Sequence, residues 1–235
     1  MNPLAVPALD PSSTALFPDP CQSSHPDGLI AIGGDLSRQR LLNAYRNGIF
    51  PWYESGGPIL WWSPDPRAVF ILGHTRTPKR LMRTLRNTDY NVTINQAFDQ
   101  VIEACAAPRG YTSDTWLTRE MIDAYVQLHQ AGDAHSLEVH IDGELAGGVY
   151  GIAIGNVFFA ESKFHRKRDA SKIALAELFN HLQAAGYLIC DCQLWNPHLE
   201  QFGVRMMDRS DFVRAVRHLT ARTASHPLMP IASSD

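Results

Sequence analysis

The sequence lacks the long apolar segment that a membrane-spanning helix requires. No apolar run in the 235 residues approaches the roughly 20 residues needed to cross a bilayer. The first residues, MNPLAVPALDPSS, also lack the basic flank and the apolar core of a signal peptide. With 45% hydrophobic residues the chain can still bury a substantial core. We therefore expect a soluble, cytoplasmic protein of one large domain or two small ones, with no membrane partner.

Cysteine is also scarce, and its spacing forms neither a disulfide framework nor a complete metal site. The chain has four cysteines, of which Cys21 and Cys105 stand alone. Cys190 and Cys192 lie near His198, but no second Cys or His pair at ligand spacing completes a zinc site. We therefore predict buried, unreactive thiols and no bound metal.

The chain has no overall excess of positive charge, but one segment concentrates basic residues. The formal net charge is −3 and the isoelectric point is near 6.3, so nucleic-acid binding would need a local basic patch. The segment TPKRLMRTLRNT predicts a helix whose basic residues recur every three or four positions: Lys79, Arg80, Arg83 and Arg86. Such a stripe is often solvated surface, but four like charges without interleaved acids repel each other. An anionic partner relieves that repulsion, so the stripe favours phosphate binding.

Aromatic residues gather in a segment that is rich in proline and glycine. Residues 49–70 read IFPWYESGGPILWWSPDPRAVF and contain three of the five tryptophans. Trp61 and Trp62 either fill a hydrophobic interface between two lobes or take part in binding. Trp52, between a proline and a tyrosine, is the better candidate for stacking on a nucleic-acid base.

Hydrophobic periodicity predicts an α+β fold. Besides the basic segment, helices are expected over residues 37–47, about 95–106 and 118–131. In the second half, turns at Asp142-Gly143 and Gly155-Asn156 imply three consecutive antiparallel strands. A helix that closes near Gly186 and a final strand complete the series, so that this strand can pair with an earlier one. We predict a small N-terminal lobe with the aromatic loop, residues 1–70, and a larger domain, residues 71–235, with a mostly antiparallel sheet and a central helix.

The final strand carries an unusual pair of polar residues. The segment LICDCQ begins like a buried strand but continues through Asp191 and Gln193, with Cys192 between them. Because successive side chains of a strand point to opposite faces, Asp191 and Gln193 are expected to share one face. The pattern therefore predicts a carboxylate and an amide side by side.

The order of strands and helix resembles the core of acyltransferases with the N-acetyltransferase (GNAT) fold. Acetyl-coenzyme A members hold pyrophosphate on a glycine-rich turn at the start of the central helix, where this chain reads HRKRDAS without glycine. Coenzyme A is therefore disfavoured as a donor. Arg166, Lys167 and Arg168 can either bind phosphate at this helix start or form an exposed basic turn, and the sequence leaves both open.

A longer series of motifs resembles a more specific family, the bacterial leucyl/phenylalanyl-tRNA-protein transferases. In chain order the motifs are GLIAIGGDLS, AYRNGIFPWY, PILWWSPDPRAVF, TWLT, HSLEVH-x-DGELAGGVYG, ESKFHRKRDASKIAL and DCQ. The resemblance implies transfer of leucine or phenylalanine from aminoacyl-tRNA to proteins that begin with arginine or lysine, marking them for degradation. It implies no cofactor and no metal.

The resemblance also implies roles for individual residues. Asp191 and Gln193 of DCQ and Glu161 of the ES motif would be catalytic, with the Gln193 oxygen accepting a hydrogen bond from the attacking amine. The donor's amino acid would occupy an apolar pocket between the sheet and the central helix, which is lined by Val149, Phe158, Leu175, Leu178 and Leu182.

The resemblance places Trp52 and Trp116 around the terminal adenosine of the tRNA, and the basic stripe along the acceptor-stem phosphates. Lys163 stands where many members carry methionine, and we expect its side chain to extend outward from the apolar pocket. Two other readings compete. An acetyl-coenzyme A-dependent N-acetyltransferase conflicts with the missing glycine turn, and a non-catalytic RNA-binding module leaves Glu161, Asp191 and Gln193 without a purpose.

Overall fold

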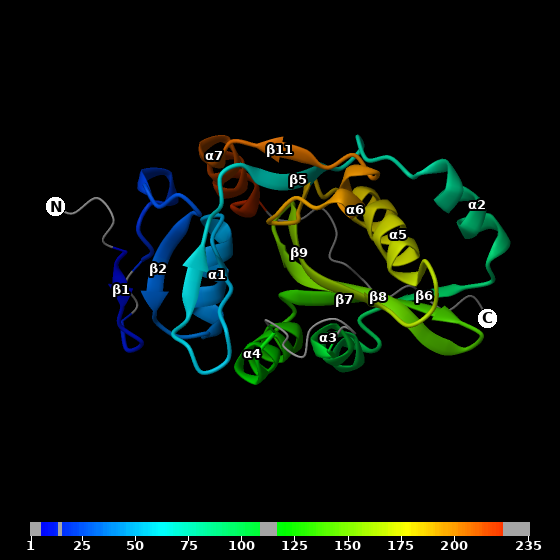
Figure 1. Ribbon diagram of the computed structural model, residues 1–235, viewed down its shortest axis with the longest axis horizontal. Coiled ribbons are helices and arrows are strands. Elements are labelled where there is room, and N and C mark those ends of the chain that lie inside the picture. Colours follow the sequence, from blue (N-terminus) through cyan, green and yellow to red (C-terminus); the bar gives the residue numbers. More distant parts are fainter. Residues whose placement is uncertain (1–5, 14–15, 109–116, 223–235) are drawn as a thin grey trace.

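Two β-sheets stand at different ends of the molecule and share a hydrophobic core (Figure 1). The computed structural model describes residues 6–13, 16–108 and 117–222. The smaller sheet has the order β1-β2-β4-β3 and consists of four short strands: β1 (Ala8–Leu9), β2 (Leu29–Gly33), β3 (Phe50–Pro51) and β4 (Leu60–Trp62).

The larger sheet has seven strands in the order β11-β5-β10-β9-β8-β7-β6. Its strands are β5 (Arg67–Ile71), β6 (Asn91–Ile94), β7 (Ala134–Ile141), β8 (Glu144–Ile154), β9 (Val157–His165), β10 (Ile189–Asp191) and β11 (Arg205–Met207). All pairs in this sheet are antiparallel except β9 and β10, which run parallel. The predicted α+β class, with a mostly antiparallel sheet and a central helix, is confirmed.

Helices cover both faces of the larger sheet. The central helix α5 (Ala170–Ala184) packs on one face, and α3 (Phe98–Ala106) and α4 (Arg119–Gln130) pack on the other (Figure 1). The remaining helices are α1 (Arg38–Arg46), α2 (Lys79–Asn87), α6 (Pro197–Glu200), α7 (Arg209–Thr220) and a 3-10 turn at Pro20–Gln22. No helix among the described residues has both the length and the apolar character needed to cross a bilayer.

The turn and capping chemistry of the sequence explains where these elements begin and end. Ser37 and Thr118 accept backbone N–H bonds at the starts of α1 and α4, as N-cap residues do. Asp142 and Gly143 both adopt positive φ in the β7–β8 turn, which is the geometry that a two-residue hairpin requires. The expected helix from residue 95 begins later, at Phe98, because Asn95 adopts a left-handed conformation with φ of 61°.

The core extends from the smaller sheet into the larger one. Trp61 is fully buried, and its indole N–H donates to the Gly33 carbonyl at 2.8 Å. Tyr45 of α1 and Phe159 of β9, with ring centroids 5.1 Å apart, belong to the same buried cluster. Trp61 is therefore a core residue of the smaller sheet, within a buried cluster that continues into the larger one. The division of the chain at residue 70 into a lobe and a catalytic domain stays a prediction.

Candidate active site

A cavity of about 200 Å³ lies between the smaller sheet, the β9 residue Glu161 and the segment that follows β10. Trp52, Glu161 and Gln193, which are predicted from motifs far apart in the sequence, all line it. The complete lining is Phe50, Pro51, Trp52, Glu161, Cys192, Gln193, Leu194 and Asn196. Glu161 is the one charged side chain among these described residues.

A β-bulge directs Glu161 into this cavity. Along the β8–β9 pair, Tyr150 faces Ser162 while Gly151 faces Ala160, so Glu161 is an extra residue without a partner in the register. A bulge of this kind bends the strand and re-aims the side chain of the extra residue. The sequence by itself suggests a continuous β8–β9 ladder, in which Glu161 would have a partner residue on β8.

The Glu161 carboxylate is held by hydrogen bonds from two directions. The Gln193 side-chain amide donates from Nε2 to Oε1 at 3.1 Å, and the Tyr125 hydroxyl donates to Oε2 at 3.0 Å. The Tyr125 hydroxyl is also 2.6 Å from that of Tyr45, and both tyrosines are fully buried. These contacts leave Glu161 little freedom to rotate away from Gln193.

Burial raises the pKa of Glu161 to about 7. Hydrogen bonds from Tyr45 and Tyr125 lower this pKa, the nearby Asp191 charge raises it, and Arg67 lowers it. Burial, and then the Glu161 charge, raise the pKa values of the Tyr45 and Tyr125 phenols well above their ordinary value. Both tyrosines therefore remain neutral donors, while Glu161 can hold or release a proton near neutral pH.

Asp191 has very different surroundings, because it is fully buried against Arg67. Arg67 Nε donates to Oδ1 at 2.8 Å and Nη2 donates to Oδ2 at 2.7 Å, and both side chains are fully buried. The guanidinium also lies 4.7 Å from the ring centroids of Phe50 and Phe212. Asp191 is thus half of a bidentate, aromatic-enclosed ion pair, and it does not line the cavity.

The prediction that Asp191 and Gln193 share one face of a continuous strand is wrong. Strand β10 ends at Asp191, and Gln193 adopts a left-handed conformation with φ of 58°. The cause is local: the Gln193 N–H donates to Asp191 Oδ1 at 3.0 Å, which folds the chain back on the carboxylate. Asp191 and Gln193 are still brought together, but through the backbone rather than by strand alternation.

The Gln193 amide has a defined orientation. When Glu161 is charged its carboxylate only accepts hydrogen bonds, so in that form Nε2 faces Glu161 and the amide presents its oxygen as the remaining acceptor. Since Gln193 lines the cavity, this oxygen is available to a donor that enters it.

The tryptophans at the cavity have separate environments. Trp52 is 43% exposed, which leaves part of its indole free to stack on a ligand. Trp62 is half-buried, and its Nε1 donates to the Trp52 carbonyl at 2.7 Å, with the ring centroids 6.4 Å apart. Trp62 therefore supports the segment that carries Trp52. Trp116 lies outside the described residues.

The five residues predicted for the aminoacyl pocket are all buried between the larger sheet and α5: Val149, Phe158, Leu175, Leu178 and Leu182. Leu175 also lines a second, larger cavity beside the start of α5. Lys163 is half-buried and lines this cavity too. The outward extension of its side chain stays a prediction. The role of these residues stays a prediction.

The basic stripe lies on α2, as the spacing predicts. Lys79, Arg80, Arg83 and Arg86 are all exposed, while Leu81 is buried. Helix α2 stands at the end of the molecule opposite the smaller sheet (Figure 1). The stripe and the cavity with Glu161 are therefore separate regions.

Three side chains of the site have no predicted role in the sequence: Arg67, Tyr45 and Tyr125. The tyrosines occupy apolar helix faces, where a core role is the default reading. Arg67 offers the only signal, as a charged residue at the head of the buried run RAVFI. Within the described residues, no group of three or more His, Cys, Asp or Glu side chains is arranged to hold a metal.

Comparison with known proteins gives a family match over most of the chain. The model of the leucyl/phenylalanyl-tRNA protein transferase family matches residues 69–217, and the model of that family's N-terminal domain matches residues 34–65. The chain belongs to the leucyl/phenylalanyl-tRNA protein transferase family. Glu161, Asp191 and Gln193 fall within the first match and Trp52 within the second.

Individual relatives carry the same family name. The leucyl/phenylalanyl-tRNA--protein transferase of Chromobacterium violaceum is 48% identical over 213 residues, which are 90% of this chain and 91% of the relative. That of Shewanella halifaxensis is 51% identical, with 86% of each chain covered. Among solved structures, a GCN5-related N-acetyltransferase from Kribbella flavida matches with a TM-score of 0.40 at 11% identity, covering 68% of this chain and 57% of that chain. Membership of the transferase family rests on the sequence matches.

Proposed function

We propose that the protein transfers leucine or phenylalanine from aminoacyl-tRNA to the α-amino group of proteins that begin with arginine or lysine, and so marks them for degradation in the cytoplasm. The observation that carries this proposal is the hydrogen-bonded pair of Glu161 and Gln193 on the wall of a cavity that also holds Trp52. Family membership supports the tRNA donor and the protein acceptor.

The reaction needs little chemical activation of either substrate. The donor is an ester, and an α-amino group has an ordinary pKa of about 7.7 to 8, so part of the acceptor is already nucleophilic near neutral pH. The amine nitrogen attacks the ester carbonyl, a C–N bond forms, and the nitrogen loses a proton. The C–O bond then breaks, and the tRNA oxygen leaves with a proton. Orientation of the amine and a nearby proton acceptor suffice for these steps.

Gln193 and Glu161 supply that orientation and that acceptor. The Gln193 oxygen accepts a hydrogen bond from the attacking amine, because its nitrogen is held by Glu161. Glu161, with a pKa near 7, accepts the proton that the amine loses on attack. The tyrosine pair holds Glu161 in place during this exchange.

Asp191 has a positioning role. Arg67 occupies both of its carboxylate oxygens, so the buried pair holds the Gln193 backbone through the 3.0 Å bond to the Gln193 N–H. The aromatic rings around Arg67 shield the pair from water.

The charge of the cavity favours a basic acceptor. Because Arg67 neutralises Asp191, Glu161 supplies the negative charge among the described cavity residues. An acceptor that begins with arginine or lysine brings a cation to this carboxylate. An acidic first residue would be repelled.

One incubation series tests the proposal. Purified protein receives a peptide that begins with arginine, with labelled leucyl-tRNA in one tube and labelled acetyl-coenzyme A in the other. We expect label in the peptide only from leucyl-tRNA, and none when the peptide begins with aspartate. Transfer from acetyl-coenzyme A, or tight tRNA binding without any transfer, contradicts the proposal.

A second experiment separates transfer from tRNA binding. We expect Gln193→Ala to lower the transfer rate about 100-fold with nearly unchanged tRNA affinity. We expect Arg83→Ala, on the exposed stripe, to weaken tRNA binding and to reduce the salt slope by about 1 without changing kcat. Equal loss of tRNA affinity in both variants contradicts this division of roles.

A further inference from the structure

We call the cavity that Glu161, Gln193 and Trp52 line the reaction cavity. A second cavity, of about 720 Å³, adjoins it and differs from it in the charge of its lining. Asn196 lines both cavities, so the two are neighbours along one wall. The described residues of the larger lining include three cations, Lys163, Arg166 and Lys172, together with His165 and His198, and no carboxylate. The cavity is therefore built to receive negative charge.

Two of the cations are held in place by the fold. The Arg166 guanidinium lies 5.4 Å from the Phe164 ring centroid, and its Nη1 donates to the Leu145 carbonyl at 3.3 Å. Lys172 Nζ lies 2.7 Å from Asp169 Oδ1 on the same helical turn. Because their positions are restrained before any ligand arrives, less side-chain entropy is lost on binding.

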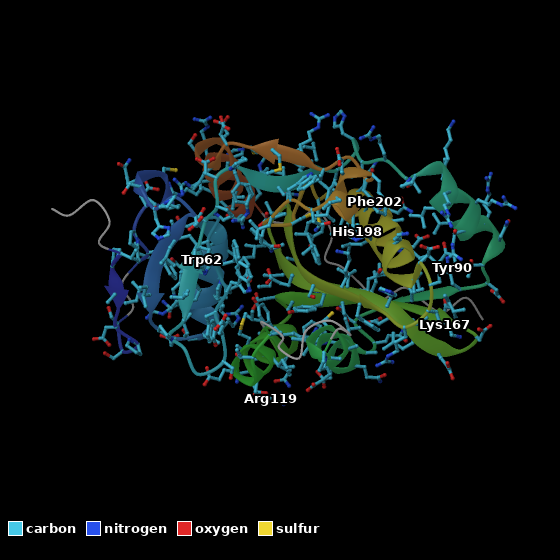
Figure 2. The ribbon with its side chains drawn as sticks, viewed as in Figure 1. Trp62, Tyr90, Arg119, Lys167, His198 and Phe202 are labelled. Carbon is cyan, nitrogen blue, oxygen red and sulfur yellow. The ribbon has the colours of Figure 1, made fainter. Side chains whose placement is uncertain are left out.

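The other basic residues of the HRKRDAS segment point elsewhere. Lys167 donates to Asp142 at 2.7 Å and to the Ile141 carbonyl at 2.9 Å, on the β7–β8 turn. Figure 2 shows Lys167 well apart from His198 and Phe202, which line the cavity. Arg168 is 79% exposed in its side chain and lies 3.6 Å from Asp169. The basic turn thus contributes Arg166, but not its other two cations, to the cavity.

Positive charge continues from this cavity toward α2. The pKa of Asp169 is lowered chiefly by its hydrogen bond from Lys172, and the charges of Arg168 and Arg80 add to the effect. Arg80 belongs to the exposed stripe on α2, so the stripe reaches the start of α5 electrostatically. Arg80 is therefore close enough to the start of α5 to affect Asp169, and Lys172 on the same turn lines the larger cavity.

We propose that the larger cavity binds the phosphodiester backbone of the single-stranded 3′ end of the donor tRNA. The inference rests on the proposed function and names the path by which the aminoacyl ester reaches Gln193. Arg166 contacts phosphate oxygens through the N–H groups of its planar guanidinium, and Lys172 contacts them through its ammonium group.

The test compares donors that differ in phosphate content. The double variant Arg166→Gln/Lys172→Gln is assayed with leucyl-tRNA, with a leucyl-CCA trinucleotide and with 3′-O-leucyladenosine, which has no phosphate. We expect KM to rise about tenfold or more for the first two donors. We expect kcat/KM for leucyladenosine to stay within about twofold, because no phosphate contact is lost. The salt slope of log KM for leucyl-tRNA should flatten by about 1.4, for two single-strand contacts.

The matched control removes two cations elsewhere. Arg119→Gln/Arg214→Gln changes exposed residues of α4 and α7 that lie outside both cavities. We expect this variant to match the wild type with all three donors.

Four results would overturn the inference. An equal loss with leucyladenosine means that the cations support the fold or the reaction itself. A loss with leucyl-tRNA but not with the trinucleotide places the contacts on the acceptor stem. A loss that depends on acidic residues in the acceptor peptide assigns the cavity to the protein substrate, and no loss at all removes the phosphate site. Absence of transfer by the wild type from every donor would instead refute the proposed function.

Discussion

Two carboxylates of one site, Glu161 and Asp191, have different partners: neutral donors surround Glu161, and a buried cation pairs with Asp191. Glu161 reaches the cavity, accepts bonds from neutral donors and has a pKa near neutrality. Asp191 is fully buried in a bidentate pair with Arg67 and does not line the cavity. The comparison teaches that the surroundings of two neighbouring carboxylates can set them apart: neutral hydroxyl and amide donors leave Glu161 a proton that exchanges near neutral pH, whereas Arg67 fixes Asp191 in a buried ion pair.

Breaking the buried pair should have the largest effect. We expect Asp191→Ala to lower the free energy of unfolding by about 3 to 5 kcal/mol, because Arg67 is left buried and uncompensated. Transfer should fall as well, since the Gln193 backbone loses its anchor. Urea unfolding checks the first part. The double variant Asp191→Leu/Arg67→Met should recover much of the stability without activity, and failure to recover would show that the pair is not the cause.

Neutralising Glu161 should separate activity from stability. We expect Glu161→Gln to lower kcat about 100-fold or more, because the proton acceptor is lost. Below about pH 4.5, where Glu161 holds its proton in the folded and the unfolded chain, the free energy of unfolding should change by less than about 1 kcal/mol, because the amide can still bond to Tyr125. Steady-state transfer assays and urea unfolding check the two parts. A loss of stability as large as that of Asp191→Ala would erase the distinction between the two carboxylates.

Titration of Glu161 should also affect how the free energy of unfolding and the transfer rate depend on pH. Its pKa is raised from 4.5 to about 7, so between these values the folded chain holds a proton that the unfolded chain has lost. This contribution to stability is fully present below about pH 4.5 and is lost as the pH rises to 7. The rate should rise over the upper part of the same range, as the carboxylate forms. Glu161→Gln should remove the trend in stability and the part of the rate increase that Glu161 causes, and leave the increase that follows deprotonation of the acceptor amine. The kcat–pH profiles and unfolding at several pH values measure these effects. An unchanged profile in this variant would assign the titration to another group.

Removing the tyrosine bond should have the smallest effect. We expect Tyr125→Phe to cost about 0.5 to 1.5 kcal/mol of stability, the usual contribution of one hydrogen bond. Because that bond lowers the Glu161 pKa, its loss should move the rising limb of the rate to higher pH with a small change in KM. Tyr53→Phe, which alters a buried tyrosine hydroxyl bonded to Thr118 rather than to Glu161, serves as the control. If the rising part of the rate–pH profile stays at the same pH in Tyr125→Phe, Tyr125 acts only in packing.

Much of the fold could be predicted because its signals are local. Ser37 and Thr118 mark helix starts, and Asp142-Gly143 marks a hairpin, since capping and turn geometry depend on a few neighbouring residues. The prediction of a strand through Gln193 was wrong for the opposite reason: the Gln193 N–H donates to the Asp191 carboxylate, which Arg67 holds in place through an ion pair with a residue far away in the sequence, and the strand ends there.

The site was predicted only in part. Motifs pointed to Glu161, Gln193 and Trp52, and the fold brings all three to one cavity. The bulge at Glu161 had no signal of its own, because a one-residue insertion in a ladder depends on the register of the partner strand. Tyr45 and Tyr125 looked like core residues and are buried as core residues, yet their hydroxyls converge on the carboxylate.

The sequence by itself determined the elements, the basic stripe of α2 and the membership of the family, because each depends on spacing along the chain. Only the tertiary structure decided that Arg67 meets Asp191, 124 positions away, and that Tyr45 meets Tyr125 across 80 positions. These contacts arise from strand pairing and core packing, in which residues with no relation in the sequence become neighbours. Whether a carboxylate keeps an exchangeable proton is set by such neighbours, so its chemistry could not be read from the chain alone.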